Sequence, residues 1–181
     1  SACLVGSEMC IRDRICVVLC QMKDIRGSLR RCRELEVPDH VELFEIKGYL
    51  QRLDGMRPLF EQINAVTHFK GMTFHEVKDA LAVLDPDGTG SRGFYIPDSA
   101  TAKLKEIRSA KKEVEERLFH AQTDAEKDDL RLKRTRLCGE EDAEEMHVRK
   151  AMGAALAPMV DDLLSDAETA GRLDFIIQKA L

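Results

Sequence analysis

The residues with the clearest potential for chemistry form one short basic run: Arg131, Lys133, Arg134 and Arg136. Guanidinium and ammonium groups contact the phosphates of nucleic acids, and each contact adds affinity that falls as salt rises. These four are therefore the candidate DNA-binding residues. Acidic residues at positions 128–129 and 140–142 would screen them, so a solvated helix face is the favoured interpretation and DNA contact is the alternative.

A second candidate is the run Asp85-Pro86-Asp87-Gly88-Thr89-Gly90, which begins like a calcium-binding EF-hand loop. Such a loop needs oxygen ligands at its first, third and fifth positions and glycine at the sixth, and all four match. It also needs a branched apolar residue at the eighth position and a bidentate Glu at the twelfth, where this chain has Arg92 and Ile96. Because the closing carboxylate is missing, we predict an ordinary tight turn.

Phe74 and Glu76 have the Phe-x-Glu spacing with which some mismatch-recognition proteins insert a phenylalanine beside a mismatched base. The run Thr73-Phe74-His75-Glu76 is also a capping box, in which the Thr and Glu side chains bond to backbone N–H groups at the start of a helix. The capping box accounts for Glu76, and Phe74 has the character of a core residue. We predict a helix that begins at Thr73, with base wedging as the less favoured alternative.

The sequence contains none of the common catalytic motifs. We find no G-x-x-x-x-G-K-[ST] phosphate loop, no G-x-S-x-G elbow and no H-E-x-x-H zinc motif. The five histidines lack paired ligand spacing, and none of the six cysteines forms a C-x-x-C pair. We predict reduced thiols and no catalytic, cofactor-binding or metal-binding residue, which leaves open whether the whole protein is an enzyme.

The composition suits long exposed helices better than a compact enzyme core. Charged residues make up 34% of the 181 residues and hydrophobic residues 44%, with no Trp and two Tyr. The net charge of -5 gives no general attraction for nucleic acid. No apolar run approaches the roughly 18 residues that cross a bilayer. We therefore expect no membrane partner and a cytoplasmic location.

The first 14 residues are set apart from the rest. The run from Ser7 to Arg14 resembles the translation of a sequencing adapter, so we interpret residues 1–14 as a non-native segment. On this hypothesis Cys3 and Cys10 have no functional role, and the natural protein continues upstream.

The remaining chain predicts an all-α fold that starts with a helical core at residues 15–97. Asp39 is the expected N-cap of its main helix, with Glu42 at the capping-box position. That helix is expected to end or kink in the stretch Gly55–Pro58. Glycines and prolines in residues 85–97 predict turns and extended chain at the end of the core.

Residues 98–181 predict a long antiparallel, lever-like helical hairpin. No Gly or Pro interrupts the stretch from Ser99 to Cys138, and its apolar residues form a seam that can cover only one partner helix. Forty helical residues would span about 60 Å. We predict the turn at Cys138-Gly139 and a returning helix that bends at Pro158.

With the hairpin and its entry laid out, the chain resembles the core and lever region of the MutS-related family of DNA mismatch repair ATPases. In that family an extended strand with an Asp-Ser pair leads into a lever helix that reads L-x-x-I-R. The corresponding segments here are Phe94-Tyr95-Ile96-Pro97-Asp98-Ser99 and Leu104-Lys105-Glu106-Ile107-Arg108. Similar segments lie at 42–47, 84–88 and 173–180, so the resemblance covers about residues 25–181.

The resemblance implies a core-and-lever portion of a DNA-binding ATPase that acts in mismatch repair or recombination. ATP and Mg would bind a separate C-terminal domain of the parent protein, which would be a homodimer. The levers would transmit ATP-driven motion to the DNA-contacting parts. DNA is the expected partner of the parent protein, and because no mismatch-recognition domain is visible, branched or recombination DNA is the alternative to a mismatch. The alternative is a helical scaffold or oligomerisation module without a DNA function.

Overall fold

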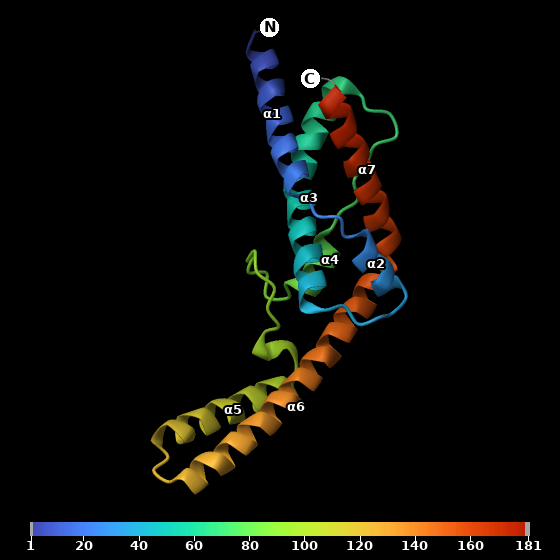
Figure 1. Cartoon of the computed structure of the whole chain (residues 1–181). Helices are drawn as coiled ribbons and strands as arrows, with labels where there is room; N and C mark the ends of the chain where they lie inside the picture. Colours follow the sequence, from blue (N-terminus) through green and yellow to red (C-terminus); the bar gives the residue numbers. More distant parts are fainter. Residues whose placement is uncertain (1, 180–181) are drawn as a thin grey trace. The chain divides into compact units, whose positions relative to one another are not determined.

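The structure is a computed structural model that describes the backbone of residues 2–179 and the side chains of residues 11–179. Over these residues the chain forms helices and no strand, so the all-α prediction is confirmed (Figure 1). None of the described helices is long and apolar enough to cross a membrane. The elements are α1 (Ala2–Gln21), α2 (Arg26–Arg33), α3 (His40–Thr67), α4 (Lys78–Leu84), η1 (Asp98–Ala100), α5 (Ala102–His120), α6 (Asp124–Leu156), η2 (Ala157–Met159) and α7 (Val160–Lys179).

The described chain forms two compact units. One, the core unit, contains the residues up to Phe94 together with those from Met152 onward. The other, the hairpin unit, is the stretch Tyr95–Ala151. The predicted division instead assigned all of residues 98–181 to a hairpin. The difference arises because α7 packs against α1 and α2 of the core unit.

The core unit is built around α3, which packs against α1 and α4. The second part of α1 lies beside α3, and α7 also packs against α1 (Figure 1). The α3 positions that face the interior are spaced three or four residues apart, so they form one apolar face of the helix. They are fully buried, and burying each such side chain contributes about 2 kcal/mol. They are Leu43, Ile46, Leu50, Leu53 and Met56.

The start of α3 confirms the predicted capping box. The Asp39 carboxylate accepts a hydrogen bond from the Glu42 backbone N–H at 2.8 Å, and the Glu42 carboxylate accepts one from the Asp39 N–H at 2.9 Å. The predicted end of this helix at Gly55–Pro58 is wrong, because α3 continues to Thr67 with Pro58 inside it. The ring of Pro58 lies on the exposed side, where water can satisfy the carbonyl that it leaves unbonded. Buried neighbours such as Leu59 hold the helix together.

The helix predicted to begin at Thr73 begins instead at Lys78, without a side-chain cap. The residues that would have formed the capping box are engaged elsewhere. Glu76 forms an ion pair with Lys78 at 2.8 Å, and the His75 backbone N–H donates to Asp166 of α7 at 3.0 Å. Glu76 therefore pairs with Lys78, and the neighbouring His75 ties the same segment to the buried Asp166.

The hairpin unit contains α5 and the first part of α6, packed antiparallel. Its turn lies at residues 121–123, so the predicted turn at Cys138-Gly139 is wrong. The Thr123 hydroxyl accepts from the Glu126 backbone N–H at 3.2 Å and so caps α6. Gly139 lies inside α6, where one glycine costs about 1 kcal/mol. The buried seam between the two helices outweighs that cost. Ile107 and Val114 of α5 pack there with Leu130 and Leu137 of α6, and the two residues of each helix are seven positions apart.

The predicted bend at Pro158 is confirmed. A single 3-10 turn, Ala157–Met159, separates α6 from α7. Pro158 cannot donate a backbone hydrogen bond, so the regular α-helical ladder stops there. Buried Leu156 and Val160 flank the turn on either side and hold it in the core unit.

Candidate functional site: a charged clamp at the base of the hairpin

The most densely bonded group of the hairpin unit surrounds Arg108 of α5. Its guanidinium donates to Glu141 at 2.9 Å and to Glu145 at 2.8 Å, both on α6. It also donates to Asp98 of η1 and to the Ile96 carbonyl, the latter at 2.8 Å. The side chain is only 14% exposed. We call this group, with Tyr95, the Arg108 clamp; it lies at the end of the hairpin away from residues 121–123.

Tyr95 completes the clamp from the segment that enters the hairpin. Its phenol oxygen accepts from Arg108 at 2.9 Å and donates to Asp98 at 3.1 Å. The Arg108 guanidinium also lies over the Tyr95 ring, 5.1 Å from its centroid, which adds a cation–π attraction. The entering segment is thus fixed to α5 by the hydroxyl group and one ring face of a single aromatic side chain.

A second tie lies about two helical turns earlier, at the start of α5. Thr101 caps the helix by accepting from the Leu104 backbone N–H at 3.0 Å. Its hydroxyl donates to Glu144 of α6 at 2.9 Å, and Lys103 forms an ion pair with the same carboxylate at 3.1 Å. One threonine therefore both starts α5 and joins it to α6.

Electrostatics keep the acidic members of this region ionised. Hydrogen bonds from Arg108 and then Tyr95 lower the pKa of Asp98. For Glu141, burial would raise the pKa, but hydrogen bonds from Lys111 and Arg108 outweigh it and lower the value. Each of these carboxylates is therefore charged at neutral pH and already has a cationic partner. Such an arrangement favours rigid positioning over proton transfer or nucleophilic attack.

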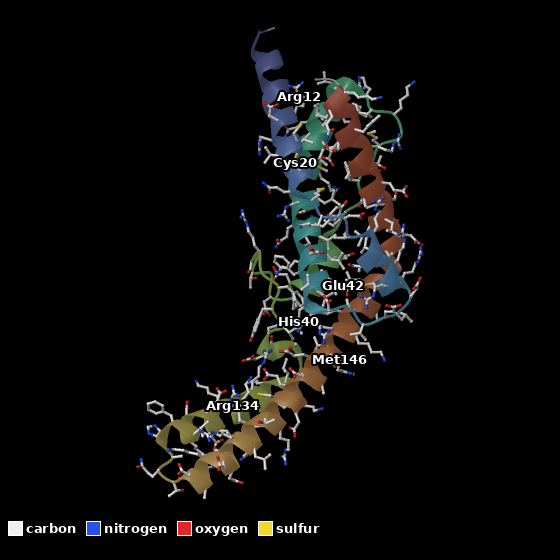
Figure 2. The ribbon with its side chains drawn as sticks, in the orientation of Figure 1. Arg12, Cys20, His40, Glu42, Arg134 and Met146 are labelled. Carbon is white, nitrogen blue, oxygen red and sulfur yellow. The ribbon has the colours of Figure 1, made fainter. Side chains whose placement is uncertain are left out.

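The four predicted DNA-binding residues lie in the first half of α6, between the turn and the clamp. Arg131 pairs with Asp128 at 3.1 Å, Arg134 with Glu115 of α5 at 2.8 Å, and Arg136 with Glu140 at 3.2 Å. Lys133 is exposed. Figure 2 labels Arg134 on the hairpin unit. Arg131 and Arg136 thus pair with carboxylates of the acidic runs that flank them in sequence, whereas the partner of Arg134 comes from α5.

The Asp85–Gly90 run forms a closed turn. The Asp85 carboxylate accepts from the Gly90 backbone N–H at 2.7 Å and from the Thr89 hydroxyl at 2.9 Å. The ammonium group of Lys47, a buried residue of α3, lies 3.6 Å from the same carboxylate. It donates to the Gly93 carbonyl at 3.1 Å, so α3 holds both ends of the loop. No group of three or more potential metal ligands is found among the described residues.

Phe74 lies against Phe60 of α3, edge to face, with ring centroids 5.0 Å apart. This contact agrees with the prediction that Phe74 is a packing residue. The described cysteines Cys16, Cys20, Cys32 and Cys138 are free thiols, as predicted. The side chains of Cys3 and Cys10 lie outside the described residues.

One polar group in the core unit was missed by the sequence analysis. Asp166 of α7 is fully buried, and its Oδ1 atom lies 2.8 Å from Nδ1 of His75. The Tyr49 phenol of α3 is also buried, and burial followed by the charge of Asp166 raises the pKa of Tyr49. Asp166 stands at an interior position of an amphipathic helix between Leu163 and Ala170. That position was the available sequence signal, because an acidic residue there needs a buried partner.

Searches for similar proteins found none: no family model, no curated protein and no solved structure matches the chain.

Proposed function

We propose that this chain is the core-and-lever portion of a MutS-like DNA-binding ATPase that acts in mismatch repair or recombination in the cytoplasm. In this proposal the hairpin unit transmits ATP-driven motion between a nucleotide-binding domain and DNA-contacting parts. ATP and Mg would bind that other domain of the parent homodimer, and DNA is the expected partner, with branched or recombination DNA as the alternative to a mismatch.

The observation that supports the proposal is the contact between two parts of the resembling motif. Asp98, from the Asp-Ser pair, is bonded to Arg108, the last residue of the L-x-x-I-R run. Leu104 and Ile107 of the same run are buried in the hairpin unit. The matched residues therefore have a shared structural task, which is to fix the start of α5 to α6.

The geometry of α6 suits transmission of motion. It is 33 residues long, which at 1.5 Å per residue is about 50 Å. Over its first part it shares a buried seam with α5, and two packed helices bend less readily than one. A stiff element of this length can carry a rigid-body displacement between distant sites.

The first test is the gene sequence downstream of Leu181. The proposal expects a Walker A loop within roughly the next hundred residues, because a P-loop is needed to hold the nucleotide phosphates. A downstream sequence without such a loop would contradict the ATPase proposal.

The second test measures coupling in the full-length protein. ATP hydrolysis is followed with and without forked DNA, in the natural sequence and in Arg108→Leu. We expect the variant to lose most of the DNA-dependent change in rate while keeping the basal rate, because the clamp fixes the lever and not the nucleotide. Arg117→Leu, on an exposed position of the same helix, is the control and should behave like the natural sequence.

A helical scaffold or oligomerisation module is the second candidate, and surface charge favours it. The hairpin unit has 13 basic and 14 acidic residues, a net charge of -1, which gives no general attraction for DNA. Phe119 and Leu132 are 85% and 71% exposed on it. Sedimentation of the full-length protein with forked DNA at several salt concentrations separates the two candidates. Self-association with no DNA binding at low salt would favour the scaffold.

A further inference from the structure

The segment between α3 and α4, residues 68–77, is held to the rest of the core unit by a small polar contact. Met72 and Val77 of this segment are buried, and Phe74 packs on Phe60. Its polar attachment to α7 is made by one residue, His75. The imidazole and the backbone N–H of His75 both bond to the same oxygen of Asp166, at 2.8 and 3.0 Å.

The two partners differ sharply in their access to solvent. The Asp166 side chain is fully buried, whereas the His75 side chain is 43% exposed. A buried carboxylate needs a compensating charge, because desolvation of an unpaired anion is costly. The exposed partner can exchange its proton with solvent, and imidazole is the side chain whose charge changes near neutral pH.

The other charged and titratable groups around this contact do not replace His75. From α7, Asp162 lies 3.6 Å from the second ring nitrogen, which adds a second negative charge. From α3, the Tyr49 phenol lies within the electrostatic field of Asp166 and stays neutral near pH 7. Within the segment, Glu76 is paired with Lys78. The surroundings of the imidazole are therefore negative, and they favour its charged form.

From this geometry we propose that His75 and Asp166 form a proton-controlled latch on residues 68–77. With the imidazole charged, the latch holds the segment against α7. With the imidazole neutral, Asp166 keeps a hydrogen bond but loses its counter-charge, and the segment opens more often. Opening uncovers the apolar side chains of Met72, Val77 and Phe60, so the latch controls access to an apolar surface. This inference does not depend on the proposed function.

The direction of the pH effect follows from the raised pKa of His75, which its hydrogen bond to Asp166 lifts above the usual 6.5. A group whose pKa is higher in the folded state contributes stability that is complete below its unfolded value. That contribution disappears as the pH rises through the folded value. The latch is therefore closed in mildly acidic solution and loosened in alkaline solution.

The test is hydrogen–deuterium exchange of the whole chain at pH 5.5 and 8.5, corrected for the intrinsic pH dependence of exchange. We expect corrected exchange in residues 68–77 to be about tenfold faster at the higher pH, the size of one charge-assisted hydrogen bond partly lost. His75→Asn keeps a donor near the Nδ1 position but cannot titrate. It should show the faster exchange at both pH values.

Two further measurements keep the outcome decisive. His120→Asn, on the hairpin unit, is the matched control and should keep the natural pH response in residues 68–77. Nitrogen NMR of the imidazole should show a proton on Nδ1 and a titration midpoint above the usual 6.5. Equal corrected exchange at both pH values in the natural sequence, or a pH response that survives in His75→Asn, would overturn the latch.

Discussion

The two units of this protein are stabilised by different forces. The core unit buries whole faces of several helices, and fully buried leucines recur along α3. The hairpin unit has a narrower apolar interior between two helices and adds a cluster of charged contacts at its base. Apolar burial is insensitive to salt and pH, whereas ion pairs respond to both. The comparison therefore predicts that the two units fail under different conditions.

The largest expected effect is a cavity in the core unit. Leu50→Ala removes a fully buried side chain of α3 and should lower the free energy of unfolding by about 3 kcal/mol. The matched change in the hairpin unit, Val114→Ala, removes fewer atoms from a seam with one partner helix and should cost about 1 kcal/mol. Urea denaturation followed by circular dichroism measures both. Equal losses would contradict the comparison.

The second effect is loss of the clamp. Arg108→Leu leaves Glu141 and Glu145 without their shared guanidinium, and we expect about 2 kcal/mol of local destabilisation. Hydrogen exchange should accelerate in residues 95–105 while α3 is unchanged. Arg117→Leu is the control. If the variant exchanges no faster than the control, the clamp does not hold the base of the hairpin.

The third comparison uses two glycines of α6, the buried Gly153 and the exposed Gly139. Replacement by alanine is expected to change stability in opposite directions at the two positions. A Cβ on Gly153 would lie 2.9 Å from the Cδ atom of Pro38, so Gly153→Ala forces a shift in the core unit and should cost about 1 kcal/mol. A Cβ on Gly139 meets nothing within 4 Å. Gly139→Ala should therefore stabilise the hairpin unit by about 0.5–1 kcal/mol, because alanine favours the helix. Melting temperatures that shift in the same direction would refute this pair.

The smallest effect is a pH response of opposite sign in the two units. The pKa values of Asp98 and Glu144 are lowered by their cationic and hydroxyl partners from ordinary values of 3.8 and 4.5. The stability that they contribute is complete above those ordinary values and is lost as the pH falls through the lower folded values. Residues 95–105 should therefore loosen below about pH 4. Residues 68–77 should loosen on the alkaline side, and exchange measured across pH 3–9 checks both.

Local signals in the sequence predicted local structure well. The Asp39–Glu42 capping box and the bend at Pro158 depend on neighbouring residues alone, and both were found. Thr123 and Glu126 form the same kind of signal, and it marks the true start of α6. The turn was predicted at Gly139 instead, although packing in a long helix can outweigh one glycine.

Tertiary contacts explain the remaining errors. The helix expected from Thr73 begins only at Lys78, in a segment that His75 ties to Asp166, 91 residues away. The sequence analysis did not predict the Arg108 clamp either. A turn at residue 139 would have placed α5 opposite the end of the chain and not opposite Glu141 and Glu145. Once the turn lies at residues 121–123, Arg108 faces Glu141 and Glu145. Register, which a periodic pattern leaves open, decides which charges meet.

The enclosed position of Lys47 has a practical consequence for covalent labelling. Its side chain is 4% exposed, and its ammonium group is bonded to the Gly93 carbonyl inside the core unit. Amine-reactive reagents, acetylating enzymes and crosslinkers all need an approachable nitrogen. In native protein they should react with exposed lysines such as Lys78 and leave Lys47 unmodified. Acylation at Lys47, read by mass spectrometry, would then count the molecules whose core unit has opened.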